Sequence, residues 1–200
     1  PDLKPIPVGV IVADSLDTDI DNIAVFGVDT DTSPYDSGSY ASSTTYLTGM
    51  AAVKAAEQMR EKLLQLAAKI LEEDITKLEF DGKRVFCEET GKEVSLFDLA
   101  TASMINNEIA LEVTYSHSSP VSPPPFMAAC AEVEVDPETG AIELLDYTAC
   151  VDCGTVVNTN LARVQTEGGL LQGIGMTLYE DVWYNEKGVN LSNSLMQYKI

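Results

Sequence analysis

The longest regular pattern of apolar residues lies between Tyr46 and Glu73, where such residues recur at spacings of three and four. Good helix formers fill the positions between them. This pattern predicts one long helix. Shorter patterns predict a helix over 8–16 and another over 96–104, where Ser95 is the expected N-cap and Asp98 completes a capping box.

Alternation of apolar and polar residues marks the predicted strands. Two hairpins are expected, over 78–95 with a type I′ turn at Asp81-Gly82 and over 126–154 with a turn at Pro137 to Gly140. Single strands are expected over 22–29 and 110–119, and a strand, turn and strand over 176–191. We therefore predict an α+β fold in which mixed sheets and hairpins pack with long helices.

A proline-rich stretch, "SPVSPPP", divides the chain into two predicted lobes. The first lobe, 1–122, holds the long helix, and the second, 123–200, holds the second hairpin and a glycine-rich helix. The chain opens and closes abruptly, without a polar tail, so we expect it to be a piece of a larger protein.

Composition narrows the classes of partner. The chain has 200 residues, 45% of them hydrophobic, and a net charge of -20, which repels a nucleic-acid backbone and an anionic membrane surface. No apolar run approaches the roughly 20 residues that span a bilayer, and no signal-peptide pattern opens the chain. We expect a cytoplasmic protein with reduced cysteines.

Three candidate sites have simpler explanations. Cys150 and Cys153 could form a redox couple or half a metal site, but a zinc site needs about four ligands, so cysteines within a strand are favoured. His117 could be a general base, although a lone histidine before a proline-rich loop more often belongs to the surface or a linker. The acidic segment 14–21 lacks the glycine and distal glutamate of a calcium loop, so no metal ligand is predicted.

A hydroxyl-rich segment precedes the long helix. Ser42, Ser43, Thr44 and Thr45 stand where the free N–H groups of a helix N-terminus favour an anion, so this turn could hold a phosphate or pyrophosphate. Alternatively, Ser43 or Thr44 only caps the helix.

The segment "NTNLARVQTEGGLLQGIG", 158–175, predicts a helix capped by Asn158 and rich in glycine. Its spacing fits neither nucleotide-binding glycine motif. The glycines allow a neighbouring backbone or a flat ligand to approach, and the amides of Gln165 and Gln172, two turns apart, could pair with the edge of a heterocycle. These residues by themselves leave helix packing slightly ahead of ligand contact.

Several motifs in order resemble the molybdenum-cofactor-binding domain of the xanthine dehydrogenase and aldehyde oxidase family. They are "GVDTDTSPYDSGSYASSTTYLTGMAAVKAA", "FMAACAEVEVDPETGAIELLDYTACVDCGTVVNTNLARVQTEGGLLQGIGMTLYED" and the closing "NSLMQYKI". The resemblance runs from about Ile11 to the last residue and is least close over 76–123. It implies that both lobes belong to one larger molybdenum-binding region.

The resemblance assigns cofactor contacts to particular positions. Ser42, Ser43, Thr44 and Thr45 match the segment that wraps the phosphates and dinucleotide portion of the molybdopterin cofactor, and Asn158 and Gln165 match residues placed against it. Relatives often carry arginine at the position of Ser43, proline at Thr159 and glycine at Val164.

For the complete protein, the resemblance implies a molybdenum-dependent oxidoreductase that hydroxylates a purine, N-heterocycle or aldehyde with oxygen from water. The family's catalytic glutamate lies in a motif beyond Ile200, so the chain is expected to be inactive alone. The implied cofactor is a molybdopterin, in its cytosine dinucleotide form, with iron-sulfur and FAD groups on other domains or subunits. The alternative is a non-catalytic acidic α+β module that binds another phosphorylated ligand or supports a catalytic chain.

Overall fold

The computed structural model describes residues 6–27, 29–31, 35, 38, 40, 42–106 and 109–199. The chain divides into two compact units, Pro1–Pro123 and Pro124–Ile200, which are described separately. The division lies one residue beyond the boundary expected from the proline-rich stretch.

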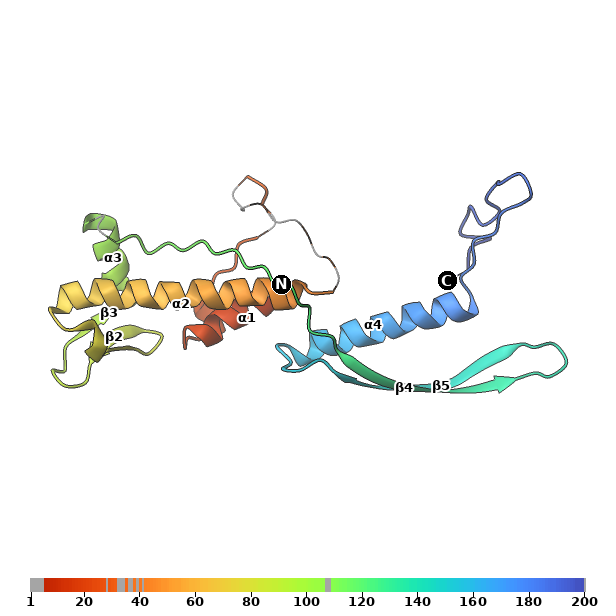
Figure 1. Cartoon of the computed structure of the whole chain (residues 1–200), viewed down its shortest axis with the longest axis horizontal. Coiled ribbons are helices and arrows are strands. Elements are labelled where there is room, and N and C mark those ends of the chain that lie inside the picture. The colour runs from red at the N-terminus through yellow and green to blue at the C-terminus, as the bar shows by residue number, and fades with distance from the viewer. Residues whose placement is uncertain are drawn as a thin grey trace. The chain divides into compact units, whose positions relative to one another are not determined.

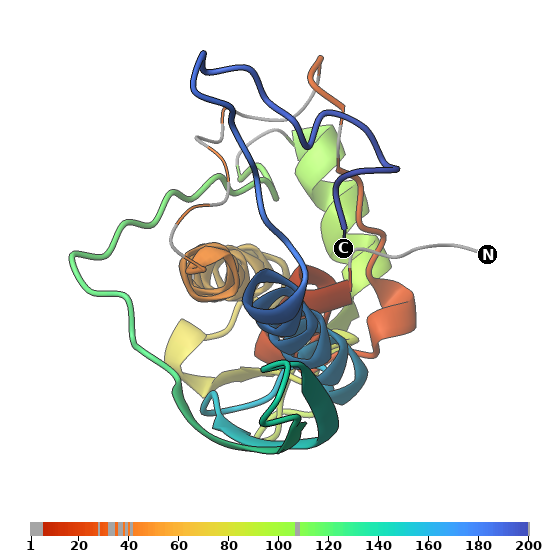
Figure 2. The same ribbon diagram turned by 90° about the vertical axis from the view of Figure 1, so that its right-hand side faces the viewer.

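The described residues of the first unit form three α-helices: α1 over Ile6–Ser15, α2 over Thr44–Leu71 and α3 over Leu96–Asn106 (Figure 1). Short 3-10 helices occupy Ile20–Asn22 and Ile75–Lys77. All three of these α-helices were predicted, and each end lies within two residues of the expected one. In Figures 1 and 2, α3 crosses α2 at a steep angle.

The predicted capping box at the start of α3 is confirmed in outline. The Ser95 hydroxyl oxygen accepts a hydrogen bond from the N–H of Asp98 at 3.1 Å. The same hydroxyl donates to the Asp98 carboxylate at 2.7 Å, so the acidic residue binds the capping side chain rather than its backbone.

A three-stranded antiparallel sheet stands where one hairpin was predicted. Its strands β1, β2 and β3 lie over Leu78–Phe80, Arg84–Cys87 and Glu93–Ser95, in that order. The predicted type I′ turn at Asp81-Gly82 is wrong. The N–H of Asp81 donates to the carbonyl of Arg84, so the central residues are Gly82 and Lys83, and of these only Gly82, with φ 83°, is left-handed.

The hydrophobic core of the first unit lies between α2 and this sheet, and α3 closes it. Its members are Leu63, Leu66, Ala67, Leu78, Phe80, Val85, Cys87, Val94 and Leu99. The α1 helix packs on the other half of α2 through small residues, since a Cβ at Gly49 would lie 3.0 Å from the Ile11 side chain. The long helix is therefore held at both halves of its length.

The strands predicted over 22–29 and 110–119 are wrong for the residues that the structure describes. Residues 23–27 belong to no helix or strand, and Val25 instead lies against Gly9 of α1. In the second segment, the Lys62 ammonium binds the carbonyl oxygens of Ala110 at 3.0 Å and Glu112 at 2.7 Å. A lysine side chain thus takes acceptors that a neighbouring strand would have used.

The second unit contains a long antiparallel ribbon and one helix. The ribbon pairs β4, Phe126–Val135, with β5, Ile142–Asp152, and confirms the predicted hairpin. The register shifts between Glu132 and Val133, which is a β-bulge. The helix α4 covers Thr159–Leu178.

The predicted strand, turn and strand over 176–191 is wrong at its start, because α4 continues to Leu178. What remains is a tight turn, in which the N–H of Gly188 donates to the carbonyl of Asn185, and a single bridge between Tyr184 and Asn190.

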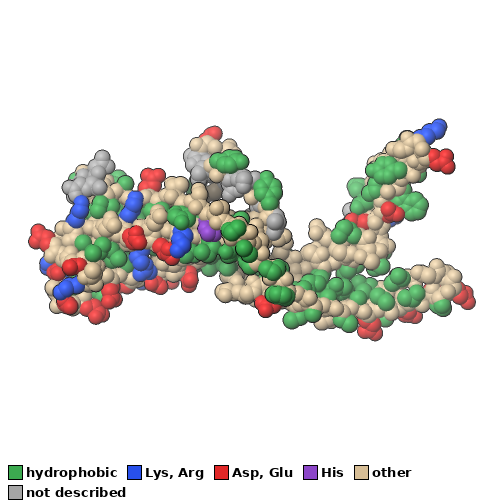
Figure 3. Space-filling view, viewed as in Figure 1, with side chains coloured by type: hydrophobic (Ala, Val, Ile, Leu, Met, Phe, Trp, Pro, Cys, Tyr) green, Lys and Arg blue, Asp and Glu red, His purple; other side chains and the backbone are tan. Residues whose placement is uncertain are grey.

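This second unit has almost no buried interior. Among residues 124–199, only Gly175 is buried, and the core residues of the described chain all lie in the first unit. Large hydrophobic side chains remain exposed along the ribbon and helix (Figure 3). The ribbon and α4 therefore keep their apolar surfaces open.

Candidate functional site

The hydroxyl-rich turn leads directly into α2. Ser42 is exposed and left-handed, with φ 55°, and Ser43 occupies the N-cap position. The Ser43 hydroxyl donates to the carbonyl of Tyr40 at 3.0 Å and makes no capping hydrogen bond to the helix. The interpretation of Ser43 as a simple side-chain cap is therefore wrong.

Thr44 and Thr45 form the first turn of α2, and both are exposed. The first N–H groups of a helix have no acceptor within it, and the Ser43 side chain does not serve them here. Exposed hydroxyls and amide donors thus meet at one helix end, which is the donor set that a phosphate group needs.

His117 lies close to this turn, 71 positions from Tyr46 in sequence. Its ring packs edge-on against Tyr46 of α2, with 6.4 Å between the ring centroids. Among the described residues no partner is recorded for its Nε2 atom, which is shielded from solvent. No spacing rule links these two residues, so only the tertiary structure reveals the contact.

In the second unit, Asn158 is the N-cap of α4, as predicted. Its Oδ1 atom accepts a hydrogen bond from the N–H of Leu161 at 2.9 Å. The cap occupies the carbonyl oxygen and leaves the NH2 group of the amide to donate elsewhere.

Gln165 and Gln172 lie two turns apart on α4, and both are exposed. A residue advances about 100° around an α-helix, so Gly168 and Gly169 flank Gln165 on the same side. A Cβ added at Gly168 or Gly169 would meet no heavy atom within 4 Å among the described residues.

Gly168 and Gly169 have open surroundings within the second unit. We expected close packing of the helix against its neighbours, and within the described chain these two glycines have no close neighbour. Neither glycine has a positive φ, so the backbone conformation does not require glycine at these positions. Each one nevertheless weakens the helix interior by roughly 1 kcal/mol relative to alanine. Their side of α4 is bare backbone next to an amide.

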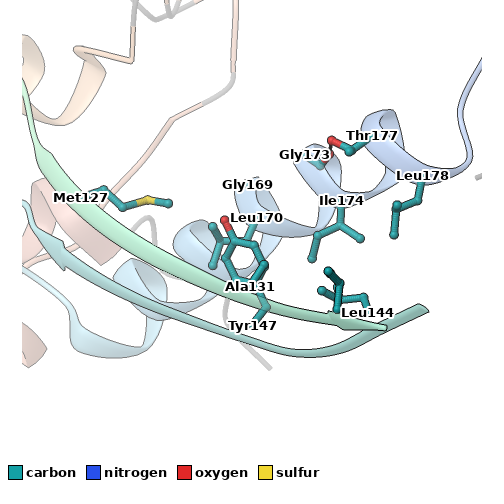
Figure 4. Close-up of a pocket in the computed structure, with 11 residues that line it drawn as sticks. Met127, Ala131, Leu144, Tyr147, Gly169, Leu170, Gly173, Ile174, Thr177 and Leu178 are labelled. Carbon is teal, nitrogen blue, oxygen red and sulfur yellow. Dashed lines mark hydrogen bonds between the residues drawn. The ribbon is translucent and has the colours of Figure 1, made fainter. Parts of the chain in front are cut away.

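An apolar groove separates α4 from the ribbon (Figure 4). Its volume is about 410 Å³. The ribbon contributes Met127, Ala131, Val133, Leu144 and Tyr147, and the helix contributes Gly169, Leu170, Gly173, Ile174, Thr177 and Leu178. Since the lining is almost entirely apolar, the groove suits hydrocarbon surface better than a charged group.

The two glutamates near the glycine-rich segment have structural partners. Glu167 forms an ion pair with Arg163 at 2.6 Å, and the hydrogen bond to Glu167 raises the pKa of the Arg163 guanidinium. Glu180 accepts a hydrogen bond from the Tyr198 hydroxyl at 3.1 Å, which raises the pKa of that phenol. Both glutamates therefore have a side-chain partner within the second unit.

The cysteines and the acidic segment lie on separate surfaces. Cys150 is in β5 and Cys153 follows it, and both are free and exposed. Asp14, Asp17 and Asp19 line a polar hollow with Asp81 and Lys83. Within the described residues, no three side chains of the metal-binding types come together as ligands.

The chain belongs to the molybdopterin cofactor-binding domain family, whose sequence model matches residues 7–200. It is 33% identical over 194 residues to the gamma subunit of the 6-hydroxypseudooxynicotine dehydrogenase complex of Paenarthrobacter nicotinovorans. It is also 36% identical over 178 residues to a probable hypoxanthine oxidase of Escherichia coli. These matches cover 94% and 88% of this chain, but 24% and 18% of the relatives.

Solved structures agree with this assignment. The fold matches carbon monoxide dehydrogenase from Oligotropha carboxidovorans with a TM-score of 0.82 and 28% identity, over 96% of this chain and 25% of that one. Quinoline 2-oxidoreductase from Pseudomonas putida matches with a TM-score of 0.77 and 26% identity, with the same coverage. The α+β fold of the molybdopterin-binding type is therefore confirmed, and the chain spans about a quarter of these proteins.

None of the helices in the described part of the chain is both long and apolar enough to cross a membrane.

Proposed function

We propose that this chain is part of the molybdenum-binding subunit of a molybdenum hydroxylase, and that Asn158 and Gln165 contact the pterin. The observation that carries the proposal is the open side of α4, where Gly168 and Gly169 leave bare backbone beside the exposed Gln165 amide. A flat heterocycle fits such a surface, because no Cβ intervenes and an amide offers a donor and an acceptor together. The donor set is thus compatible with a pterin.

The two amides have different tasks in this proposal. Asn158 uses its Oδ1 atom as the helix cap, so its NH2 group donates to an acceptor on the pterin. Gln165 keeps both amide groups available and fixes the orientation of the ring edge. Together they orient and retain the cofactor.

The phosphate portion is assigned to Ser42, Ser43, Thr44 and Thr45 in the first unit. The support is the exposed start of α2, whose N–H groups the Ser43 side chain leaves uncapped. These donors stabilise an anion without a basic residue, which suits a chain with a net charge of -20. A lysine or arginine elsewhere in the complete subunit can add to this binding.

When bound, the molybdenum cofactor supplies the redox centre for hydroxylation of a purine, N-heterocycle or aldehyde carbon with oxygen from water. We assign cofactor binding and no catalytic residue to this chain. Glu167 and Glu180 are paired with Arg163 and Tyr198. The relatives act, by their names, on hypoxanthine, 6-hydroxypseudooxynicotine and carbon monoxide. A small molecule is thus the proposed substrate.

The finer parts of the proposal concern cofactor form and partners. We assign the cytosine dinucleotide form of the cofactor. The proposed partners are the rest of the molybdenum subunit and the domains or subunits that carry the iron-sulfur and flavin groups. The support is that matched relatives include a subunit of a dehydrogenase complex and a large chain of carbon monoxide dehydrogenase. A cytoplasmic location completes the proposal and agrees with four free cysteines.

The test replaces Gln165 with alanine in the complete subunit and measures molybdenum by mass spectrometry and released CMP per protein. We expect both to fall at least several-fold, since the cofactor loses its orienting amide. Asn160→Ala is the matched control, because Asn160 is an exposed amide on another side of α4. If Gln165→Ala keeps full metal and CMP content, the assignment of Gln165 is wrong. A wild-type preparation free of both, despite an intact cofactor supply, favours the non-catalytic alternative.

A further inference from the structure

In the first unit, the segment that follows α3 runs back beside α2 toward the start of that helix (Figure 1). We call residues 109–117 the strap. Its beginning is tied to α3, because the Ser103 hydroxyl donates to the carbonyl of Ile109 at 2.7 Å and accepts from the N–H of Leu111 at 3.3 Å. The side chains of Ile109 and Leu111 also pack against the hydrophobic core. The strap therefore leaves α3 from a fixed point.

The strap contacts α2 at two places that are far apart on the helix. The Lys62 ammonium binds the carbonyl oxygens of Ala110 at 3.0 Å and Glu112 at 2.7 Å. The His117 ring packs edge-on against Tyr46, which lies in the first turn of α2. Residue numbers rise along the strap as they fall along the helix, so the two segments are antiparallel.

The strap has little slack between these two contacts. Lys62 and Tyr46 are 16 residues apart on α2, which is a rise of about 24 Å along an α-helix. The seven steps from Ala110 to His117 span at most about 25 Å in a fully extended chain. Because the two lengths nearly match, the strap has to cross in a nearly extended form. A slip of one residue at Lys62 would move the ring by about 3.3 Å.

Hydrogen bonds do not secure the contact at the start of α2. The Nε2 atom of His117 is shielded from solvent and has no partner among the described residues, which is unfavourable for a polar atom. The first turn of α2 lacks a side-chain cap, since the Ser43 hydroxyl donates to the carbonyl of Tyr40. The position of the ring therefore depends on the strap that carries it.

We propose that the strap holds the uncapped first turn of α2 in place, and that Lys62 is the positioning residue that sets the register of the strap. The His117 ring limits fraying of the helix start by packing on Tyr46. Lys62 lies more than four turns away on the same helix and acts through the strap. A lysine suits this task, because one ammonium has three donors and can bind two backbone carbonyls at once.

The consequence for cofactor binding rests on the proposed function, in which the hydroxyl-rich turn at 42–45 holds the phosphate portion. A frayed helix start disperses the N–H groups that together favour an anion. Lys62 should therefore influence retention of the phosphate portion without contacting it.

The test replaces Lys62 with methionine in the complete subunit, which removes the ammonium and keeps an apolar stem. Amide hydrogen exchange is followed by mass spectrometry on peptides from both halves of α2. We expect exchange at least about fivefold faster over 44–50 and unchanged over 63–71. Lys62→Arg should restore slow exchange, since a guanidinium can also donate to two carbonyls. Lys77→Met is the matched control, because it removes an ammonium that pairs with Glu89 at 2.6 Å.

A second variant tests whether Lys62 acts through the ring. His117→Ala should speed exchange over 44–50 by a similar factor, and adding Lys62→Met to it should change exchange no further. Additive effects, or wild-type exchange over 44–50 in either single variant, overturn the proposal. Faster exchange over the whole of α2 in Lys62→Met also overturns it, because the lysine would then support general stability.

Molybdenum and released CMP are measured on the same samples, so that this inference and the phosphate assignment are judged separately. We expect the CMP content to fall in Lys62→Met and in His117→Ala. Faster exchange over 44–50 with full CMP content supports the strap and rejects the phosphate assignment of the hydroxyl-rich turn. Wild-type exchange with a lowered CMP content rejects the strap alone.

Discussion

Arg60 of α2 binds Asp17, just beyond the end of α1, with 2.8 Å between Nη2 and Oδ2. The same guanidinium donates to the carbonyl oxygens of Ser15 and Phe80, each at 3.4 Å, and lies over the Phe80 ring at 5.4 Å from its centroid. Because Asp17 is 68% exposed at its side chain, the ion pair itself contributes little. The carbonyl and ring contacts make Arg60 the link among α1, α2 and β1.

Arg60→Ala should therefore destabilise the protein by roughly 1–3 kcal/mol. Arg60→Lys should recover less than half of this loss, since an ammonium cannot reach both carbonyls and the carboxylate at once. Asp17→Asn should cost less than about 1 kcal/mol. Urea unfolding followed by circular dichroism measures all three. If lysine restored the wild-type midpoint, charge rather than the forked geometry would be the stabilising feature.

Gly82→Ala should be strongly destabilising, because two effects add. Gly82 has φ 83°, and its Cβ would overlap the backbone carbonyl of Asp17. Gly91→Ala is the matched control, since Gly91 has φ 70° but nothing within 4 Å of its Cβ position. We expect a loss of roughly 1–2 kcal/mol from left-handed strain at Gly91 and a larger one at Gly82. Equal melting temperatures for the two variants would show that the sheet turn can move away from α1.

Asn158 allows the cap to be separated from the cofactor contact. Asn158→Asp keeps a side-chain oxygen for the N–H of Leu161 but loses the NH2 donor. It should therefore preserve stability and lower molybdenum content, whereas Asn158→Ala should also cost roughly 1 kcal/mol of stability. Metal analysis and thermal unfolding of the complete subunit check both. Full metal content in the aspartate variant would restrict Asn158 to its capping role.

The Asp81 carboxylate should make stability depend on pH in acid. Hydrogen bonds from the backbone N–H of Arg84, and then of Lys83, lower the pKa of Asp81. A lowered folded pKa stabilises the protein above the unfolded pKa of about 3.9, and this contribution is lost as the pH falls through the folded pKa. Asp81→Asn keeps an acceptor oxygen for the turn but cannot titrate.

The difference in unfolding free energy between wild type and Asp81→Asn should therefore shrink as the pH is lowered from about 5 to 2. Urea titrations at a series of pH values measure it. A difference that stays constant across this range would mean that Asp81 has the same pKa in the folded and unfolded protein.

The sequence predicted the elements that local forces decide. The helix over Thr44–Leu71 follows from apolar spacing, the start of α3 from the Ser95–Asp98 pair, and the ribbon from alternation on either side of the Pro137–Gly140 turn. The family could be recognised from its motifs because they combine particular residue types at fixed distances along one chain. Each of these signals is contained within a few turns or two adjacent strands.

Pairing between distant segments could not be predicted in this way. Residues 110–119 have the composition of a strand, yet Lys62 binds two of their carbonyl oxygens. From the sequence, His117 could be a general base, with a surface or linker position favoured, and the structure brings it against Tyr46 at the start of α2. A strand needs a neighbour, and which neighbour arrives depends on the whole topology.

The sequence by itself determined the helices, the ribbon, the caps at Ser95 and Asn158, and the family to which the chain belongs, because each depends on residues close together in the chain. Only the tertiary structure decided that Ser43 turns its hydroxyl to Tyr40 instead of capping α2, and that a Cβ at Gly168 or Gly169 would meet no heavy atom within 4 Å among the described residues. The direction of a side chain and the surroundings of a bare backbone depend on packing across the fold, which residue spacing does not encode.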